Sequence, residues 1–161
     1  MPRGPRFLIP YACYHIITRG NQQQTIFLDD ADYEIYLTKI KRYKKRHNFQ
    51  LYAFCLMPNH VHLVGQPEDP AGPPRFMHGL SLSYALHFNK RYKKVGHLWQ
   101  DRFISKTIAK DGYLLDCIQY VENNPIRANM VKAAAEYNWS SYRERFTEET
   151  CKKGLLDELC L

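Results

Sequence analysis

Hydrophobic and polar residues follow two rhythms along the first half of the chain. Residues 12–18 alternate between apolar and polar side chains and are rich in β-branched residues, which predicts a strand. Residues 29–47 begin with acidic side chains and end with basic ones, which is typical of a helix. Residues 49–57 and 61–66 predict two further strands. The short turn between these two strands favours a hairpin.

The second half of the chain continues the same plan. Residues 68–74 are rich in Pro, Gly and Ala and predict a loop, followed by a helix over residues 75–92 and a strand over 102–109. The order strand, helix, strand, strand, helix, strand predicts an α+β fold of the ferredoxin-like, or RRM-like, kind. Such a fold is a four-stranded antiparallel sheet with one face open. A further helical pattern over residues 112–131 could lie across that face.

Two histidines, His60 and His62, stand one residue apart in the apolar run 55–65. Side chains alternate between the faces of a strand, so both rings should point the same way. Neutral imidazole is the commonest protein metal ligand, and this spacing would fix two coordination positions at once. Taken alone, the pair could also be two unrelated histidines on a half-exposed strand.

The helical pattern after the fourth strand places Tyr120 and Asn124 four residues apart, and so on one helix face. A tyrosine can act as a nucleophile that forms a covalent intermediate, and an amide oxygen can complete the coordination of a hard metal ion. Two structural interpretations stay open. Tyr120 could be a boundary residue with a buried ring, and Asn124 could be the N-cap of a helix that begins at Pro125.

Five motifs occur in order over one small domain, and together they resemble the REP-associated tyrosine transposases. This family is a branch of the HUH single-strand transposase superfamily. The resemblance covers residues 11–142 of a single domain that spans 1–161. The motifs are residues 14–21 (YHIITRGN), 56–64 (LMPNHVHLV), 96–103 (GHLWQDRF), 120–128 (YVENNPIRA) and 139–142 (WSSY).

The resemblance implies an HUH endonuclease architecture and a metal-assisted reaction. Tyr120 would be the nucleophile, and His60, His62 and Asn124 would bind the metal ion. The implied activity is cleavage and rejoining of single-stranded DNA at a hairpin, through a 5′-phosphotyrosine that retains the energy of the broken bond. Two imidazoles alone suit Zn²⁺, whereas an amide, waters and a phosphate suit Mg²⁺ or Mn²⁺. The resemblance favours Mg²⁺ or Mn²⁺.

Charge and aromatic content agree with a nucleic-acid partner. The chain has 161 residues, a formal net charge of +7 and 12 tyrosines. Basic side chains gain from counterion release at phosphates, and aromatic rings are platforms for unpaired bases. The predicted phosphate contacts, which lie inside or beside the motifs, are Arg19, Arg102, Lys106 and Arg127. Three glutamines at 22–24 replace the charged residues common after the first motif in this family, which leaves DNA contacts by that turn open.

Two basic tracts, residues 41–46 and 90–94, each end a predicted helix. They add Lys44, Lys45 and Arg91 as candidate DNA contacts. Cations in a last helical turn also complement the helix dipole, so a purely structural role is the alternative for both tracts.

Other features of the sequence indicate the compartment in which the protein works. Its 5 cysteines are scattered without a CxxC pair, which excludes a zinc knuckle and favours a reducing compartment. Neither a signal sequence nor a membrane span is evident, so we expect a cytoplasmic protein without a membrane partner. Trp99 is expected to anchor the fold rather than stack on DNA. Monomer and homodimer both stay open.

Two other functions remain possible at this point. The chain could be a binding module that recognises a nucleic-acid hairpin without cleaving it, because fold does not imply activity. It could also be a metal-dependent phosphohydrolase that uses water as its nucleophile. Residues 147–161, after the resemblance ends, could form a docking helix or a frayed end.

Overall fold

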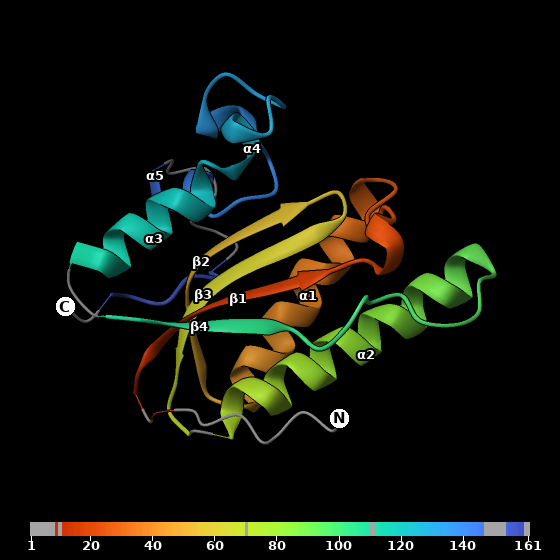
Figure 1. The fold of residues 1–161 in the computed structure, drawn as a ribbon, viewed down its shortest axis with the longest axis horizontal. Helices are drawn as coiled ribbons and strands as arrows, with labels where there is room; N and C mark the ends of the chain where they lie inside the picture. The colour runs from red at the N-terminus through yellow and green to blue at the C-terminus, as the bar shows by residue number, and fades with distance from the viewer. Residues whose placement is uncertain (1–8, 10, 70, 110–111, 147–153, 160–161) are drawn as a thin grey trace.

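The computed structural model describes residues 9, 11–69, 71–109, 112–146 and 154–159. Its strands are β1 (Cys13–Arg19), β2 (Phe49–Met57), β3 (His60–Pro67) and β4 (Ile104–Ile108) (Figure 1). Its longer helices are α1 (Asp30–Arg46), α2 (Gly72–Tyr92) and α3 (Gly112–Glu122). The short helical segments are η1 (Asn21–Gln23), α4 (Asn124–Arg127), η2 (Ala134–Glu136) and α5 (Tyr142–Phe146).

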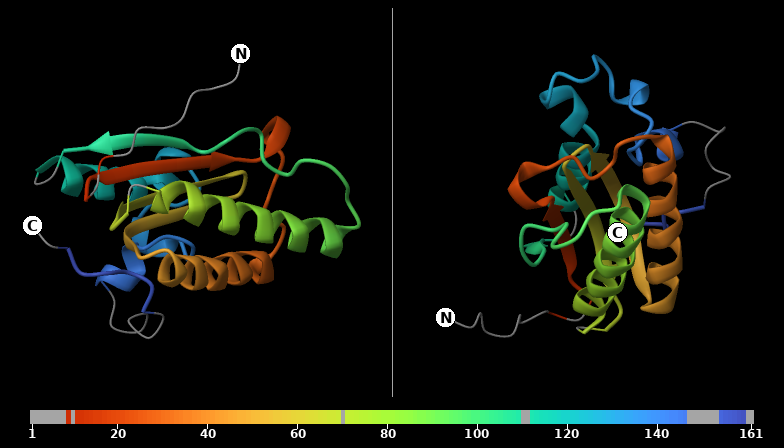
Figure 2. Two further views of the ribbon diagram at one scale, coloured as in Figure 1. Left: turned by 90° about the horizontal axis from the view of Figure 1, so that it is seen from below. Right: turned by 90° about the vertical axis from the view of Figure 1, so that its right-hand side faces the viewer.

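The strands form one sheet in the order β2-β3-β1-β4, and every neighbouring pair is antiparallel. This order confirms the predicted ferredoxin-like plan. The β2–β3 hairpin turns through Pro58 and Asn59, as expected. Helices α1 and α2 pack together on one face of the sheet (Figure 2), and α3 contacts β2 and β3 on the other.

The two long helices begin and end close to their predicted bounds, for local reasons. The Asp29 side chain accepts a hydrogen bond from the backbone N–H of Asp32 at 3.1 Å and caps the N-terminus of α1. Helix α2 begins at Gly72, three residues before the predicted start, because proline suits the first turn of a helix. It ends where Lys93 adopts a left-handed conformation, with φ of 52°.

The main core lies between the sheet and the pair α1 and α2, and it is rich in aromatic residues. Tyr36, Tyr84 and Phe88 from the helices pack against Ile16 and Leu63 from the sheet. All five side chains are fully buried. Full burial of such a side chain stabilises the fold by about 1.5–3 kcal/mol. This face is therefore closed and serves stability.

Trp99 also belongs to this main core. Its ring packs against the buried cluster, and its indole Nε1–H donates to the carbonyl of Ser81 at 2.9 Å. This placement confirms that Trp99 anchors the fold.

A smaller core lies between the sheet and α3. Leu114, Ile118 and Val121 project from α3 onto the sheet, where they meet the buried thiols of Cys13 and Cys55. The helix therefore lies across the face that the sequence predicted to be open. The same face also carries the paired histidines of β3.

The described end of the chain is neither a helix nor a frayed end. Residues 154–159 run in an extended course beside α1 and β2, and the side chain of Leu155 is buried in the main core. The backbone N–H of Asp157 donates to the carbonyl of Leu51 at 2.8 Å, and the carboxylate of Asp157 accepts from Lys44 Nζ at 2.6 Å. The rest of the predicted tail lies outside the described residues.

Within the described ranges, none of the helices is long and apolar enough to cross a membrane.

Candidate active site

His60 and His62 lie at the start of β3, with their ring centroids 4.9 Å apart. β3 is a central strand of the sheet, so both residues are held by neighbours on either side. His62 pairs with Ile17 of β1 and Cys55 of β2, and only 5% of it is exposed. His60 is half-buried at the edge of the site.

A hydrogen bond at Nδ1 orients each of these rings. Nδ1 of His60 lies 2.6 Å from Oδ1 of Asn59, and Nδ1 of His62 lies 2.9 Å from Nε2 of His15. No hydrogen bond engages Nε2 of either ring within the described part of the chain. When one ring nitrogen donates its proton to a partner, the other keeps a lone pair for a metal ion. Both Nε2 atoms are therefore free to coordinate.

Burial keeps the histidines in the neutral form that metal binding requires. Desolvation, together with the charges of His60 and His15, lowers the pKa of His62 to about 3. Desolvation and the nearby ammonium of Lys106 lower the pKa of His15 to about 4. Desolvation and then Arg19 also lower the pKa of His60. The imidazoles are therefore uncharged at neutral pH.

Tyr120 lies near the end of α3 and is not among the buried residues of this helix. Half of its surface is exposed, so the interpretation of Tyr120 as a residue with a buried ring is wrong. Its ring meets His15 edge-on, with centroids 6.2 Å apart. The guanidinium carbon of Arg127 lies 3.7 Å from the centre of the tyrosine ring. An accessible phenol thus stands beside the histidines and under a cation.

Asn124 does not share a continuous helix with Tyr120. Helix α3 ends at Glu122, and Asn124 is the first residue of α4. Pro125 has no backbone N–H to donate to the carbonyl four residues earlier, which interrupts the helix. The N-cap of α4 is Asn123, so the N-cap interpretation of Asn124 is wrong. Nδ2 of Asn124 is buried and has no hydrogen-bond partner among the described residues. The buried amide group of Asn124 is therefore left without a hydrogen-bond partner within this part of the structure.

The four predicted phosphate contacts gather around the histidines. Arg19 lies next to His60 and lines, with Gln23, Asn59 and Gln100, a cavity of about 290 Å³. Arg19 and Arg102 also share a neighbouring cavity of about 270 Å³. Arg127 contacts the Tyr120 ring, and Lys106 pairs with His15 across β1 and β4.

Two cations of the basic helix ends make contacts within the fold. Lys44 donates to the carboxylate of Asp157 and to the carbonyl of Leu155 at 2.6 Å each. Arg91 binds Asp29 through two hydrogen bonds and the buried Asp32 through one of 2.7 Å.

These contacts engage Lys44 and Arg91 within the molecule, so neither enters the site described here. The ion pairs were not foreseeable from the basic tracts, because their partners lie elsewhere in the sequence. Lys45, the third cation predicted from these tracts, is exposed on α1.

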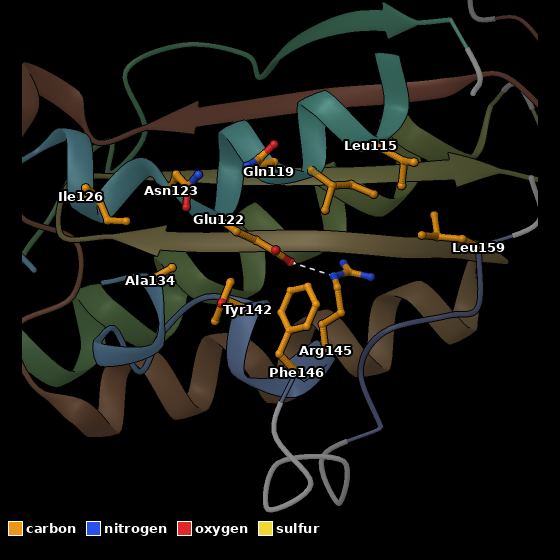
Figure 3. A pocket seen from close by; sticks show the side chains of 11 residues that line it. Leu115, Gln119, Glu122, Asn123, Ile126, Ala134, Tyr142, Arg145, Phe146 and Leu159 are labelled. Carbon is orange, nitrogen blue, oxygen red and sulfur yellow. Dashed lines mark hydrogen bonds and ion pairs between the residues drawn. The ribbon is translucent and has the colours of Figure 1, made fainter. Parts of the chain in front are cut away.

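A cavity of about 500 Å³ lies on another side of α3, between this helix and α5 (Figure 3). Glu122 is buried at its edge, where Arg145 Nε and Ser141 Oγ donate to its carboxylate at 3.1 and 2.7 Å. This cavity contains none of the predicted site residues. Its ion pair ties the end of α3, and therefore Tyr120, to the rest of the domain.

The metal ligands that the sequence predicts are two histidines and an amide. Within the described ranges, no group of three or more His, Cys, Asp or Glu side chains is arranged to hold a metal ion. A structural zinc site of the Cys and His type is therefore not present in those ranges. The sequence reasoning missed His15 and Asn59, although both stand inside its motifs and His15 alternates with the apolar positions of the first strand.

Solved structures resemble this fold. A REP-associated tyrosine transposase bound to a REP hairpin superposes with a TM-score of 0.74 at 18% identity, over 93% of this chain and 88% of that one. A protein from Deinococcus radiodurans R1 that is named as a transposase gives a TM-score of 0.50 at 20% identity, over 75% of this chain and 96% of that one. Both likenesses support the α+β fold with a four-stranded antiparallel sheet.

Sequence comparison gives the relationship. A Haemophilus influenzae protein that carries the name of a REP-associated tyrosine transposase is 28% identical over 105 residues, which are 58% of this chain and 59% of that protein. The chain thus matches less than two thirds of the length of this relative. The family model described as "Transposase IS200 like" matches residues 10–124, well over half of the chain. The chain therefore belongs to the IS200-like transposase family.

Proposed function

We propose that this protein cleaves and rejoins single-stranded DNA beside a hairpin, through a covalent 5′-phosphotyrosine on Tyr120. The observation that carries the proposal is the shared position of Tyr120 and the histidines. The half-exposed Tyr120 ring contacts His15, and His15 is hydrogen-bonded to His62. A candidate nucleophile and a candidate metal site thus meet on one face of the sheet, in a chain of a transposase family.

His60, His62 and Asn124 are the residues that would hold a divalent metal ion. Each histidine has its Nε2 free, and the amide of Asn124 carries a buried polar atom without a partner. The amide's oxygen and nitrogen exchange positions by rotation of the side chain, so the unpartnered position can present either atom. A divalent ion held by these residues would supply Lewis acidity toward the scissile phosphate, and so would stabilise the charge that develops there.

The kinds of ligand in this proposed site support the choice of metal. Two protein nitrogens and one amide oxygen leave positions for water and phosphate oxygens, and no thiolate contributes. Mg²⁺ and Mn²⁺ prefer such oxygen-rich coordination, while the imidazoles favour Mn²⁺ within this pair. Mg²⁺ or Mn²⁺ is therefore the proposed cofactor.

The reaction at Tyr120 is a transesterification. The phenolic oxygen forms a bond to phosphorus, the bond from phosphorus to the 3′ oxygen breaks, and that oxygen takes up a proton while the phenol proton goes to solvent. Arg127 lies over the Tyr120 ring and contributes positive charge beside the phosphate that becomes bonded to the Tyr120 oxygen. Attack by another 3′-hydroxyl reverses these bond changes and joins two strands without ATP.

DNA would cross the face of the sheet that carries these side chains. Arg19 and Arg102 line neighbouring cavities at one end of the site, and Lys106 and Arg127 lie beside His15 and Tyr120. Cations spaced along a path favour a phosphate backbone over a small anion. The neighbouring structure bound to a REP hairpin supports a hairpin-containing strand as the substrate.

The decisive experiment is the capture of the covalent intermediate. End-labelled single-stranded hairpin DNA from beside the gene is incubated with the protein and Mn²⁺ or Mg²⁺, and adducts are separated on denaturing gels. We expect an adduct with the unchanged protein and none with Tyr120→Phe. Tyr113→Phe is the matched control, because Tyr113 is an exposed tyrosine of the same helix. It should form the adduct normally.

Three results would contradict the proposal in different ways. An adduct that persists in Tyr120→Phe would assign another nucleophile. Cleavage without an adduct, retained in Tyr120→Phe, would indicate a phosphohydrolase that uses water. Hairpin binding without cleavage under either metal would indicate a binding module.

A further inference from the structure

His15 lies between the two chemical groups of the proposed site. It sits on β1, next to the central strand that carries His60 and His62. The edge of its ring faces the edge of the His62 ring, with centroids 5.1 Å apart and planes inclined by 25°. Tyr120 meets it on another side at 6.2 Å. His15 thus contacts both the proposed metal ligand and the proposed nucleophile.

The bond between His15 and His62 is buried and specific in its atoms. Nε2 of His15 lies 2.9 Å from Nδ1 of His62, and the two residues are 7% and 5% exposed. Two neutral imidazoles can share only one proton in such a contact, so one ring donates and the other accepts. If His62 donates from Nδ1, its Nε2 bears the lone pair. If His15 donates, Nε2 of His62 carries the proton and cannot bind a metal ion.

We propose that His15 is a positioning residue, which accepts the Nδ1–H of His62 and so holds Nε2 of His62 ready for a divalent metal ion. This inference rests on the proposed function, in which His62 binds the metal. Metal-ligating histidines commonly donate their second nitrogen to a carboxylate, a carbonyl or water. Here a buried neutral imidazole takes that place.

The pair His60 and Asn59 shows the same arrangement at the other ligand. In the orientation that the structure gives the Asn59 side chain, Oδ1 accepts, so Nδ1 of His60 donates across their 2.6 Å contact. The proton positions of the two metal ligands then match, with both Nε2 atoms deprotonated. In His60 the partner fixes this state by itself, whereas in His62 it depends on His15.

His15 does not serve as a third ligand in this arrangement. Its Nε2 is occupied by His62, and His15, His60 and His62 do not form a three-ligand cluster among the described residues. Lys106 pairs with His15 across the sheet, so a cation rather than a carboxylate stands beside it. Such a neighbour favours the neutral ring, which is able to accept the proton of His62.

The direct test is nitrogen NMR of the histidine rings in the metal-free protein. We expect His62 to carry its proton on Nδ1 in the unchanged protein. Replacing His15 by Phe removes the acceptor while keeping an aromatic ring, and should move the proton of His62 toward Nε2. His15→Gln offers an amide oxygen near the position of Nε2 and should restore the Nδ1–H form. His78→Phe, an exposed position of α2, is the matched control.

The second readout is the affinity for Mn²⁺ in the absence of DNA, measured by electron paramagnetic resonance. Loss of such a supporting partner typically weakens metal affinity by about 10–100-fold, so we expect that loss in His15→Phe and substantial recovery in His15→Gln. A His62 proton on Nε2 in the unchanged protein would overturn the inference without recourse to any variant. Equal Mn²⁺ affinity in His15→Phe and the unchanged protein would overturn it as well.

The two proposals fail in distinguishable ways. If the unchanged protein forms no DNA adduct but the NMR and Mn²⁺ results are as expected, His15 still positions a metal ligand and only the proposed reaction falls. If the adduct forms and the His15 variants behave like the unchanged protein, the reaction stands and the role of His15 falls.

Discussion

Neighbouring residues of the same two strands serve opposite purposes on the two faces of the sheet. Ile16 and Leu63 point toward α1 and α2 and lie in the closed aromatic core. His15 and His62, each one position away, point toward α3 and are hydrogen-bonded to each other. Because alternate residues of a strand face opposite ways, one strand can carry a core and a site together.

The closed face makes the other face possible. Burying polar imidazoles gives less stabilisation than burying hydrocarbon of the same size, and their charged forms are strongly disfavoured. The core beneath α1 and α2 supplies the stability that holds the histidines in place. Replacing a side chain of the closed face should therefore damage the stability of the fold. Replacing a side chain of the other face should damage the site.

The largest effect on stability is expected at the closed face. Leu63→Ala removes a fully buried side chain from the centre of the sheet and should lower the free energy of unfolding by about 2–5 kcal/mol. Urea denaturation measures this loss, and His60→Ala at the half-buried edge of the site is the comparison. An equal loss of unfolding free energy in His60→Ala would contradict this difference between the two faces.

A somewhat smaller effect is expected at the buried ion pair that anchors α3. Glu122→Gln leaves Arg145 without its charged partner and should cost about 2–3 kcal/mol, below the usual 3–5 because Arg145 keeps some solvent contact. The same denaturation experiment measures it. Glu158→Gln, an exposed acidic position, should change little. A stable Glu122→Gln protein would show that α3 does not depend on this pair.

Acidic pH should reveal the buried histidines of the site face. Unfolded histidine has a pKa near 6.5, whereas the folded values are about 4 for His15 and about 3 for His62. Below pH 6.5 the unfolded chain therefore binds protons that the folded chain does not. The free energy of unfolding should fall by at most about 1.4 kcal/mol per pH unit for each histidine.

Denaturation between pH 7 and pH 4 measures this dependence, and His15→Gln should show a shallower loss than the unchanged protein. At pH 7 and above, the stability that depends on keeping these histidines neutral is fully present. Identical slopes in the two proteins would contradict the proposed burial of a neutral histidine pair.

The smallest effect is expected for single phosphate contacts. Arg19→Gln should reduce the slope of log affinity against log salt by about 0.7, the value for one phosphate on a single strand. Fluorescence anisotropy with labelled hairpin DNA at several salt concentrations measures it. Lys45→Gln compares an exposed lysine of α1, predicted from the sequence as a DNA contact, with Arg19 beside the histidines. A larger change in Lys45→Gln would place the DNA path along the helices instead.

The alternation that divides the two faces was readable in the sequence, and the strands and long helices lie close to their predicted bounds. His60 and His62 share a face because strand geometry alone requires it. The partnership of His15 with His62 was not predictable, since it depends on the register of β1 against β3. Local pattern does not determine such a register.

Two other features of the structure were not predicted, for different reasons. The ion pairs of Lys44 and Arg91 were not predictable, because basic helix ends do not reveal Asp157, Asp29 and Asp32 as their partners. The break between Tyr120 and Asn124 had a local signal in the proline at 125, but the helical spacing around it favoured a continuous helix. Non-local pairing and competing local signals thus account for the differences.

The measurement that tests the site most directly is an anomalous difference map from crystals of the unchanged protein soaked in Mn²⁺. We expect one strong peak within bonding distance of Nε2 of both His60 and His62, with the amide of Asn124 turned toward it. A peak bonded to other side chains, or none at this pair, would contradict the assignment of the α3 face as the metal-dependent site.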